Sequence, residues 1–128
     1  MFRLLLLTLI VTGLAGAFLL HQWWENRTAP AHEYLFVYGT LTNPLTRFYA
    51  CRCLPETMAP ATLSGYARIP HQRTIVPGTS EDRVSGTILT ITPVELRRFD
   101  RYERVPQKYR RERVTINEKD VWVYIKQP

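Results

Sequence analysis

The sequence is poor in the residue types that hold metals or disulfide scaffolds. Its 128 residues include only two cysteines and three histidines. Two cysteines cannot build the disulfide framework of a small secreted domain, and without further ligands they are too few for a zinc site. Only one residue separates Cys51 from Cys53. In a regular helix or strand, two cysteines at this spacing rarely have the Cα distance that a disulfide needs. We therefore expect two free thiols, no metal and no cofactor.

Acidic residues are also scarce, with 11 Asp and Glu against 17 Lys and Arg and a net charge of +6. Much of the excess lies between residues 97 and 113. Such a basic run can bind nucleic acid or anionic lipid. The sequence has no RNA-binding aromatic motif and no helix-turn-helix pattern, so we expect no nucleic-acid partner. Lipid headgroups or a solvated face account better for the charge.

One segment has no charge at all. Residues 4–20 are almost wholly apolar, and Trp23 and Trp24 follow them. A membrane-spanning helix needs roughly 17 to 25 such residues, and Trp favours the membrane–water interface. Ala15-Gly16-Ala17 also resembles a signal-peptide cleavage site. The prediction is an N-terminal transmembrane helix at residues 1–24, with a cleaved signal peptide as the alternative.

Both alternatives place the rest of the chain outside the cytoplasm. Arg3 and the terminal amine favour a cytoplasmic N-terminus by the positive-inside bias. We expect a membrane-anchored domain on the periplasmic side of a bacterial inner membrane, or a secreted domain after cleavage. Residues 25–33 form a polar tether. Residues 34–128 are long enough to bury one core, and no internal repeat or low-complexity segment divides them.

The globular part contains more predicted strands than helices, so we expect the α+β class. Asn43 and Pro44 begin one helix, which ends before Pro55. Thr92-Pro93-Val94-Glu95 is a capping box that begins another. Strands are predicted at residues 34–38, 61–69 with a bulge at Gly65, 84–91, 109–116 and 121–126, with a loop at 70–82 and a turn at 117–120.

The first strand runs directly into Tyr38-Gly39-Thr40-Leu41. Gly39 lets a ligand approach the main chain closely, and a strand that ends this way can present backbone N–H groups to an anionic or carbonyl-bearing ligand. The segment is thus a candidate binding loop. A plain strand followed by a turn explains the same four residues.

Glu103 is out of place on the second helix. At about 100° per residue, it falls between Leu96 and Phe99, the residues expected to face the core. Desolvation there would raise the pKa of its carboxyl group, as a general base requires. The alternative is a structural glutamate that pairs with Arg104 or Arg110.

Five short motifs then occur in a fixed order over residues 34–126. They are Tyr38-Gly39-Thr40-Leu41, Ala61-Thr62-Leu63-Ser64-Gly65-Tyr66, Val84-Ser85-Gly86-Thr87-Ile88-Leu89, Leu96 through Val114 (LRRFDRYERVPQKYRRERV) and Val121-Trp122-Val123-Tyr124. Together they resemble the γ-glutamylcyclotransferase family, including its AIG2-like and γ-glutamylamine cyclotransferase branches. The resemblance covers nearly the whole globular part.

The resemblance implies a small mixed β-barrel with flanking helices and an enzyme that needs no metal. Such an enzyme cleaves a γ-glutamyl amide by attack of the substrate's α-amine on its own γ-carbonyl, releasing 5-oxoproline and an amine or amino acid. It implies Glu103 as the catalytic base, and Tyr38, Gly39, Thr40, Leu41 and Tyr109 as substrate-binding residues. One position departs from the family pattern, since Arg104 stands where the family often has glycine. A non-catalytic barrel that binds a small ligand or a membrane is the alternative.

Overall fold

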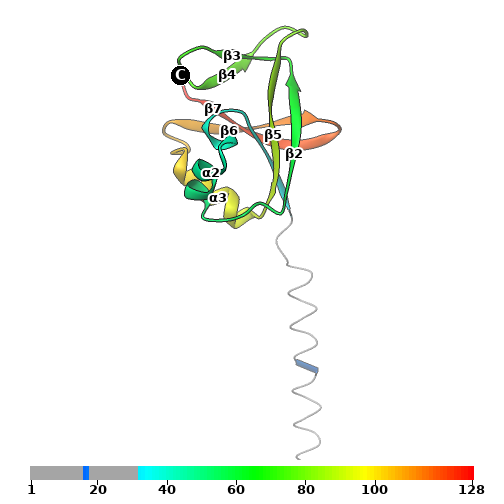
Figure 1. The fold of residues 1–128 in the computed structure, drawn as a ribbon, viewed down its shortest axis with the longest axis vertical. Coiled ribbons are helices and arrows are strands. Elements are labelled where there is room, and N and C mark those ends of the chain that lie inside the picture. The colour runs from blue at the N-terminus through cyan, green and yellow to red at the C-terminus, as the bar shows by residue number, and fades with distance from the viewer. Residues whose placement is uncertain (1–15, 18–31) are drawn as a thin grey trace, which may run out of the picture. The chain divides into compact units, whose positions relative to one another are not determined.

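The computed structural model describes residues 16–17 and 32–128 (Figure 1). The predicted membrane segment at residues 1–24 lies outside the described residues, apart from two helical residues, Gly16 and Ala17. Within the two described ranges, no helix is both long and apolar enough to cross a membrane. The anchor, the signal-peptide alternative and the orientation therefore stay predictions of the sequence. Ala31–Pro128 form one compact unit.

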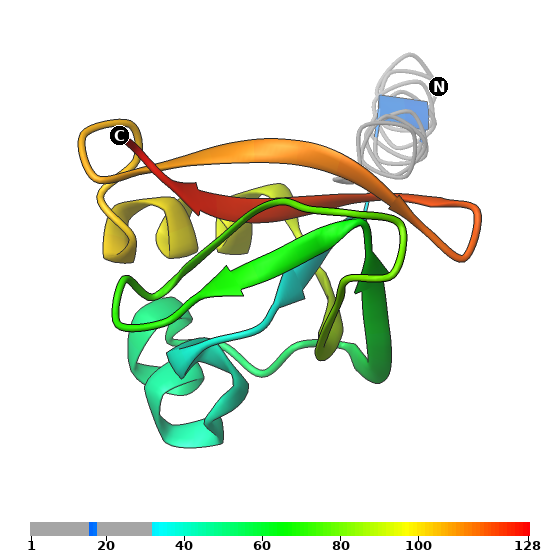
Figure 2. The same cartoon turned by 90° about the horizontal axis from the view of Figure 1, so that it is seen from above.

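The compact unit contains a mixed sheet and a separate strand pair. Its strands are β1 (Glu33–Val37), β2 (Thr57–Ser64), β3 (Tyr66–Ile69), β4 (Thr74–Pro77), β5 (Arg83–Ile91), β6 (Tyr109–Ile116) and β7 (Lys119–Lys126). Five of them form a sheet in the order β2-β5-β1-β7-β6, in which β1 and β7 are parallel and the other neighbours antiparallel. Strands β3 and β4 pair antiparallel to each other (Figures 1 and 2).

The expected closed barrel is wrong, whereas the α+β class is confirmed. Among the described strands, β2 and β6 are the two edges of the sheet and do not pair with each other. Gly65 is the reason that β3 does not extend the sheet. Its φ of 83° ends β2 and redirects the chain, a conformation that glycine adopts without steric cost. The β3–β4 pair packs instead against β5 and β7.

The region around this pair differs from the sequence prediction in two further ways. The single strand predicted at 61–69 is split into β2 and β3, and β4 lies inside the predicted loop at 70–82. Strand β2 also begins earlier than predicted, at Thr57, and includes Pro60. Proline lacks the N–H that a central strand must donate, but an edge strand such as β2 tolerates it.

Both faces of the sheet are covered. Along β1, Leu35 and Val37 belong to a core shared with the helices, whereas Phe36 belongs to a second core shared with β4 and the β6–β7 hairpin. This alternation is the period-2 pattern of a strand buried on both faces. Strand β5 approaches β1 so closely at Gly86 that a Cβ there would lie 2.3 Å from the carbonyl oxygen of Val37.

Two α-helices pack side by side on one face, α2 (Pro44–Cys51) and α3 (Pro93–Tyr102), and a short 3₁₀ turn, η1 (Thr40–Thr42), precedes α2 (Figure 1). The predicted helix starts are confirmed. The Asn43 side chain accepts hydrogen bonds from the N–H groups of Leu45 and Thr46. The Thr92 side chain accepts from Glu95 N at 3.2 Å, and Glu95 Oε1 accepts from Thr92 N at 2.9 Å.

Strands β6 and β7 form the predicted hairpin with a shorter connection. Asn117 and Glu118 alone make the turn, with φ of 49° and 65°. Two consecutive left-handed residues match the turn type that suits the twist of a two-residue hairpin.

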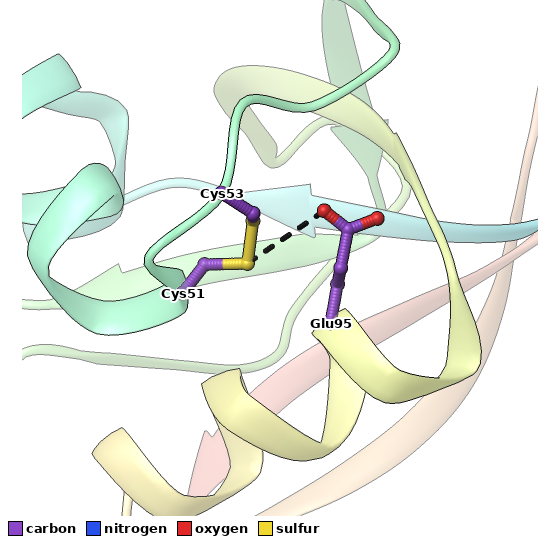
Figure 3. Close-up of side chains that lie close together, drawn as sticks. All are labelled: Cys51, Cys53 and Glu95. Atoms are coloured by element: carbon purple, nitrogen blue, oxygen red, sulfur yellow. Dashed lines mark hydrogen bonds between the residues drawn. A yellow bond between two sulfur atoms is a disulfide. The ribbon is translucent and has the colours of Figure 1, made fainter.

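The expectation of free thiols at Cys51 and Cys53 is wrong, because the two residues form a disulfide (Figure 3). Cys51 is the last residue of α2, and Arg52 takes a left-handed conformation with φ of 51°. The chain therefore leaves helical geometry between the two cysteines, and their Cα atoms lie 5.1 Å apart, within the usual range for a disulfide.

Candidate active site

A pocket of about 600 Å³ opens beside the C-terminal end of β1. Parts of the chain that are distant in sequence line it, namely residues 36–41, 68–71, 73–74, 102–104 and 108–109 with Tyr124. All six residues that the sequence singled out lie among them, which are Tyr38, Gly39, Thr40, Leu41, Glu103 and Tyr109. The fold thus brings the turn after β1 and the end of α3 to one cavity. The roles of these residues stay predictions.

Glu103 reaches this pocket because α3 ends there. Its N–H donates to the Phe99 carbonyl at 2.9 Å, as helix geometry requires, and its φ and ψ of −81° and −1° are still helical. Leu96 and Phe99 are buried while the arginines of the helix are exposed. The predicted position of Glu103 on the core-facing side of α3 is therefore confirmed.

The Glu103 side chain is half-buried and has no hydrogen-bond or ion-pair partner within residues 32–128. The structural alternative required a pair with Arg104 or Arg110, but Arg110 Nε instead contacts Glu112 Oε1 at 2.8 Å. No fully buried side-chain oxygen in the described part of the chain lacks a partner, so the unpaired Glu103 carboxylate is accessible to solvent, and Glu103 lines the pocket. Burial raises the pKa of Glu103 above its ordinary value of 4.5, while Lys108 lowers it in part.

Four tyrosines line the pocket, and the hydroxyl groups of three of them are held in place by hydrogen bonds. Tyr38 donates to the Tyr124 carbonyl oxygen at 2.5 Å, Tyr109 to the Arg73 carbonyl oxygen at 2.9 Å, and Tyr124 to Asp100 Oδ1 at 2.7 Å. Burial raises the pKa of Tyr38 to about 12, and it also raises the pKa values of Tyr109 and Tyr124. All three are therefore neutral hydrogen-bonding groups near pH 7, not bases.

The turn after β1 supplies the main-chain side of the pocket. Within residues 32–128, the N–H groups of Gly39, Thr40 and Leu41 donate to no protein acceptor. The Leu41 side chain is 4% exposed and packs in the core, which fixes the position of the turn. Unpaired N–H groups on a fixed turn can bind a carboxylate or stabilise a developing oxyanion.

The sequence did not predict that several basic side chains line the pocket. Arg68, His71, Arg73 and Lys108 line it together with Arg104. The first three come from the β3–β4 region, which the sequence did not place near Glu103. The local sequence around these three residues does not indicate a binding site, because they reach the pocket only through the packing of β3–β4 against β5 and β7.

Arg104 has the backbone conformation that explains the family's frequent glycine at this position. Its φ is 55°, in the left-handed region, which costs a non-glycine residue roughly 1 kcal/mol. The chain turns there, and Lys108 N then donates to the Arg104 carbonyl at 2.8 Å. The Arg104 side chain is exposed and is not paired with Glu103. The departure from the family pattern therefore leaves the Glu103 carboxylate free.

A second cluster lies at the opposite end of α3. Glu95 Oε2 lies 3.9 Å from Cys51 Sγ, and Cys51 Sγ is bonded to the sulfur of Cys53 in the disulfide (Figure 3). A disulfide sulfur is not a thiolate, which is the form of cysteine that binds metals and acts as a nucleophile. In the disulfide state this cluster offers only one carboxylate, which caps the helix.

Comparison with known proteins places the chain in a family. The family described as "Gamma-glutamyl cyclotransferase, AIG2-like" matches residues 35–128. Among curated proteins, no significant match was found. Two Arabidopsis thaliana proteins with solution structures are similar. The first is 27% identical with a TM-score of 0.63, over 76% of this chain and 63% of that protein. The second is 28% identical with a TM-score of 0.61, over 74% of this chain and 68% of that one.

A solved structure named "Gamma-glutamyl cyclotransferase" shares the fold at 15% identity, with a TM-score of 0.53 over 76% of this chain and 68% of the other. The family match covers β1 from Leu35 onward, the other six strands, both helices and every residue that lines the pocket. The resemblance read from five motifs is thus confirmed, and this chain belongs to the γ-glutamyl cyclotransferase, AIG2-like family.

Proposed function

We propose that this protein is an enzyme that cleaves γ-glutamyl amides by intramolecular cyclisation, releasing 5-oxoproline and an amine or amino acid. The observation that carries the proposal is the unpaired, half-buried Glu103 carboxylate in the same pocket as the free N–H groups of residues 39–41. Family membership supports the reaction class.

The reaction needs a base, a folded substrate and an oxyanion site. Glu103 removes a proton from the substrate's α-ammonium group, and the free amine then attacks the γ-carbonyl carbon to form the five-membered ring. The N–H groups of the turn after β1 stabilise the oxyanion that develops on the carbonyl oxygen. As that intermediate collapses, the protonated Glu103 returns its proton to the leaving nitrogen and the amide C–N bond breaks. The ring nitrogen gives its second proton to the departing amine or to water, which leaves the neutral lactam of 5-oxoproline.

A raised pKa suits Glu103 to both proton transfers, since a base that accepts and then donates a proton works best with a pKa near the working pH. Holding the substrate in its folded conformation is the other large contribution, because an oriented intramolecular attack avoids most of the entropic cost. The three neutral tyrosines give the pocket fixed walls for that purpose.

The test is 5-oxoproline release by the purified full-length chain from a panel of γ-glutamyl amino acids, peptides and amines. We expect release from at least one class, with loss of the activity on Glu103→Gln. Binding of these compounds without any 5-oxoproline, unaffected by Glu103→Gln, would instead favour a non-catalytic binding protein of the same fold.

A further inference from the structure

The charges around the pocket are unbalanced. Four Arg and Lys side chains line it, Arg68, Arg73, Arg104 and Lys108, whereas Glu103 is the sole carboxylate among the described lining residues. His71 adds a fifth basic group. A concave surface with a surplus of one charge sign concentrates ligands of the opposite sign.

Within the described compact unit, none of these cations forms an ion pair with a carboxylate, although Lys108 is near enough to Glu103 to lower its pKa in part. Asp100 of α3 and Glu112 of β6 are engaged elsewhere, since Asp100 pairs with Arg111 at 2.9 Å and Glu112 with Arg110. An unpaired cation at a cavity is available to a bound anion.

Two of the cations are directed by the tyrosines of the pocket. The Arg68 guanidinium lies 5.7 Å from the centre of the Tyr38 ring and donates to the Ser85 carbonyl oxygen at 3.1 Å. The Lys108 ammonium lies 5.9 Å from the centre of the Tyr109 ring. Both contacts lie within the range of cation–π attraction. They hold the two charges on the walls that the substrate would touch.

Arg73 and Arg104 are fixed through their backbones. Both have left-handed φ values, 54° and 55°. The Arg73 carbonyl accepts the Tyr109 hydroxyl, and the Arg104 carbonyl accepts the N–H of Lys108. The backbone that carries these two exposed side chains is thus tied to the same tyrosine wall.

The substrate of the proposed reaction uses only part of this positive charge. Its glutamyl head carries one carboxylate, and its ammonium group faces Glu103. At least two of the four Arg and Lys side chains then remain for the portion beyond the scissile bond. We propose that this released portion carries a carboxylate, so that the preferred substrates are γ-glutamyl amino acids or peptides, not γ-glutamyl monoamines or polyamines. The inference rests on the cyclotransferase function proposed above.

The experiment compares three substrates that differ only beyond the scissile nitrogen. They are γ-glutamylalanine, γ-glutamylalanine amide, which replaces the carboxylate by a neutral group of the same shape, and γ-glutamylethylamine, which lacks it. The full-length chain is assayed for 5-oxoproline, and kcat and KM are measured for each. We expect kcat/KM to be about tenfold higher for γ-glutamylalanine than for the other two, as a charge-assisted contact contributes.

Variants then assign the preference to the pocket. Arg68→Gln, Arg73→Gln, Arg104→Gln and Lys108→Gln are tested one at a time, with Arg97→Gln as a control that removes an exposed charge of α3 outside the pocket. At least one pocket variant should reduce the preference for γ-glutamylalanine to within about twofold, mainly through KM, while Arg97→Gln keeps it. Thermal unfolding of each variant shows that the fold is retained.

The outcomes separate this inference from the function on which it rests. Equal turnover of all three substrates, or a preference unchanged by every pocket variant, overturns the carboxylate preference and leaves the cyclotransferase function standing. A preference for γ-glutamylethylamine overturns it as well. No 5-oxoproline from any of the three or from the wider panel overturns both.

Discussion

The two ends of α3 carry a glutamate each, and the two residues have opposite situations. Glu95, in the first turn, accepts a hydrogen bond from Thr92 N and lies beside the Cys51–Cys53 disulfide. Glu103 follows the last turn, and its side chain has no hydrogen-bond or ion-pair partner within the described compact unit. The Glu95 carboxylate completes the N-terminal cap of the helix, whereas the Glu103 carboxylate makes no hydrogen bond to the helix.

Electrostatics makes the contrast sharper. A helix N-terminus favours a negative charge and a C-terminus disfavours it. Glu95 thus lies where a carboxylate stabilises the helix, and Glu103 lies where it does not. Burial in the pocket adds to the cost of ionising Glu103 and raises its pKa. Of the two glutamates, Glu103 is the better candidate for acid–base catalysis, because its carboxylate lies in an electrostatically unfavourable position without a structural partner.

The largest expected effect is on catalysis at one end of the helix only. Glu103→Gln should lower kcat for 5-oxoproline release by roughly 10²- to 10⁴-fold, because the base is lost while the shape is kept. Glu95→Gln should leave kcat within about twofold, since glutamine can also complete a capping box. Steady-state kinetics of both variants with one substrate makes the comparison. Equal losses in the two variants would mean that neither residue is the base.

The next effect is on stability at the other end. Thr92→Ala removes the N-cap hydroxyl, which accepts from Glu95 N, and should lower the free energy of unfolding by about 1 kcal/mol. Thr92→Ser keeps the hydroxyl and should recover most of the loss. Chemical denaturation measures both values. A fall in kcat with Thr92→Ala at temperatures where the protein is fully folded would contradict the separation of the two ends.

The features of α3 were readable from the sequence because they are local. The capping box depends on four consecutive residues, and the angular position of Glu103 depends only on helical periodicity. The order of five short motifs was enough to indicate the family. These signals place Glu103 and the turn after β1 correctly without any knowledge of the sheet.

The features that were missed depend on left-handed residues or on distant packing. The disulfide forms because Arg52 has φ of 51°, and arginine is not a residue from which such a conformation is expected. The β3–β4 pair leaves the sheet at Gly65, where the sequence pattern predicts only a bulge within one strand. With that pair misplaced, Arg68, His71 and Arg73 could not be assigned to the pocket. The sequence therefore indicated Glu103 and the turn after β1 as lining residues, but not the basic side chains that surround them.

The smallest expected effect is a pH dependence of stability that belongs to Glu103. Because its pKa is raised on folding, the folded state holds this proton more tightly than the unfolded chain. Below its ordinary value of 4.5 both states are protonated and Glu103 has no net effect. As the pH rises from there, the free energy of unfolding falls until the pH has passed the pKa of the folded state. Glu103→Gln should lose this slope, and Glu95→Gln should keep it.

The same folded-state pKa should govern catalysis. The acidic limb of kcat/KM reports the base in the free enzyme, so its midpoint should lie above 4.5 and coincide with the upper end of the stability slope. Urea unfolding of the wild type and Glu103→Gln between about pH 4 and pH 8 gives one value, and the rate profile gives the other. If the slope disappears in Glu103→Gln but the rate limb lies at a different pH, another group is the base. In that case the contrast between the two ends of α3 describes stability and not catalysis.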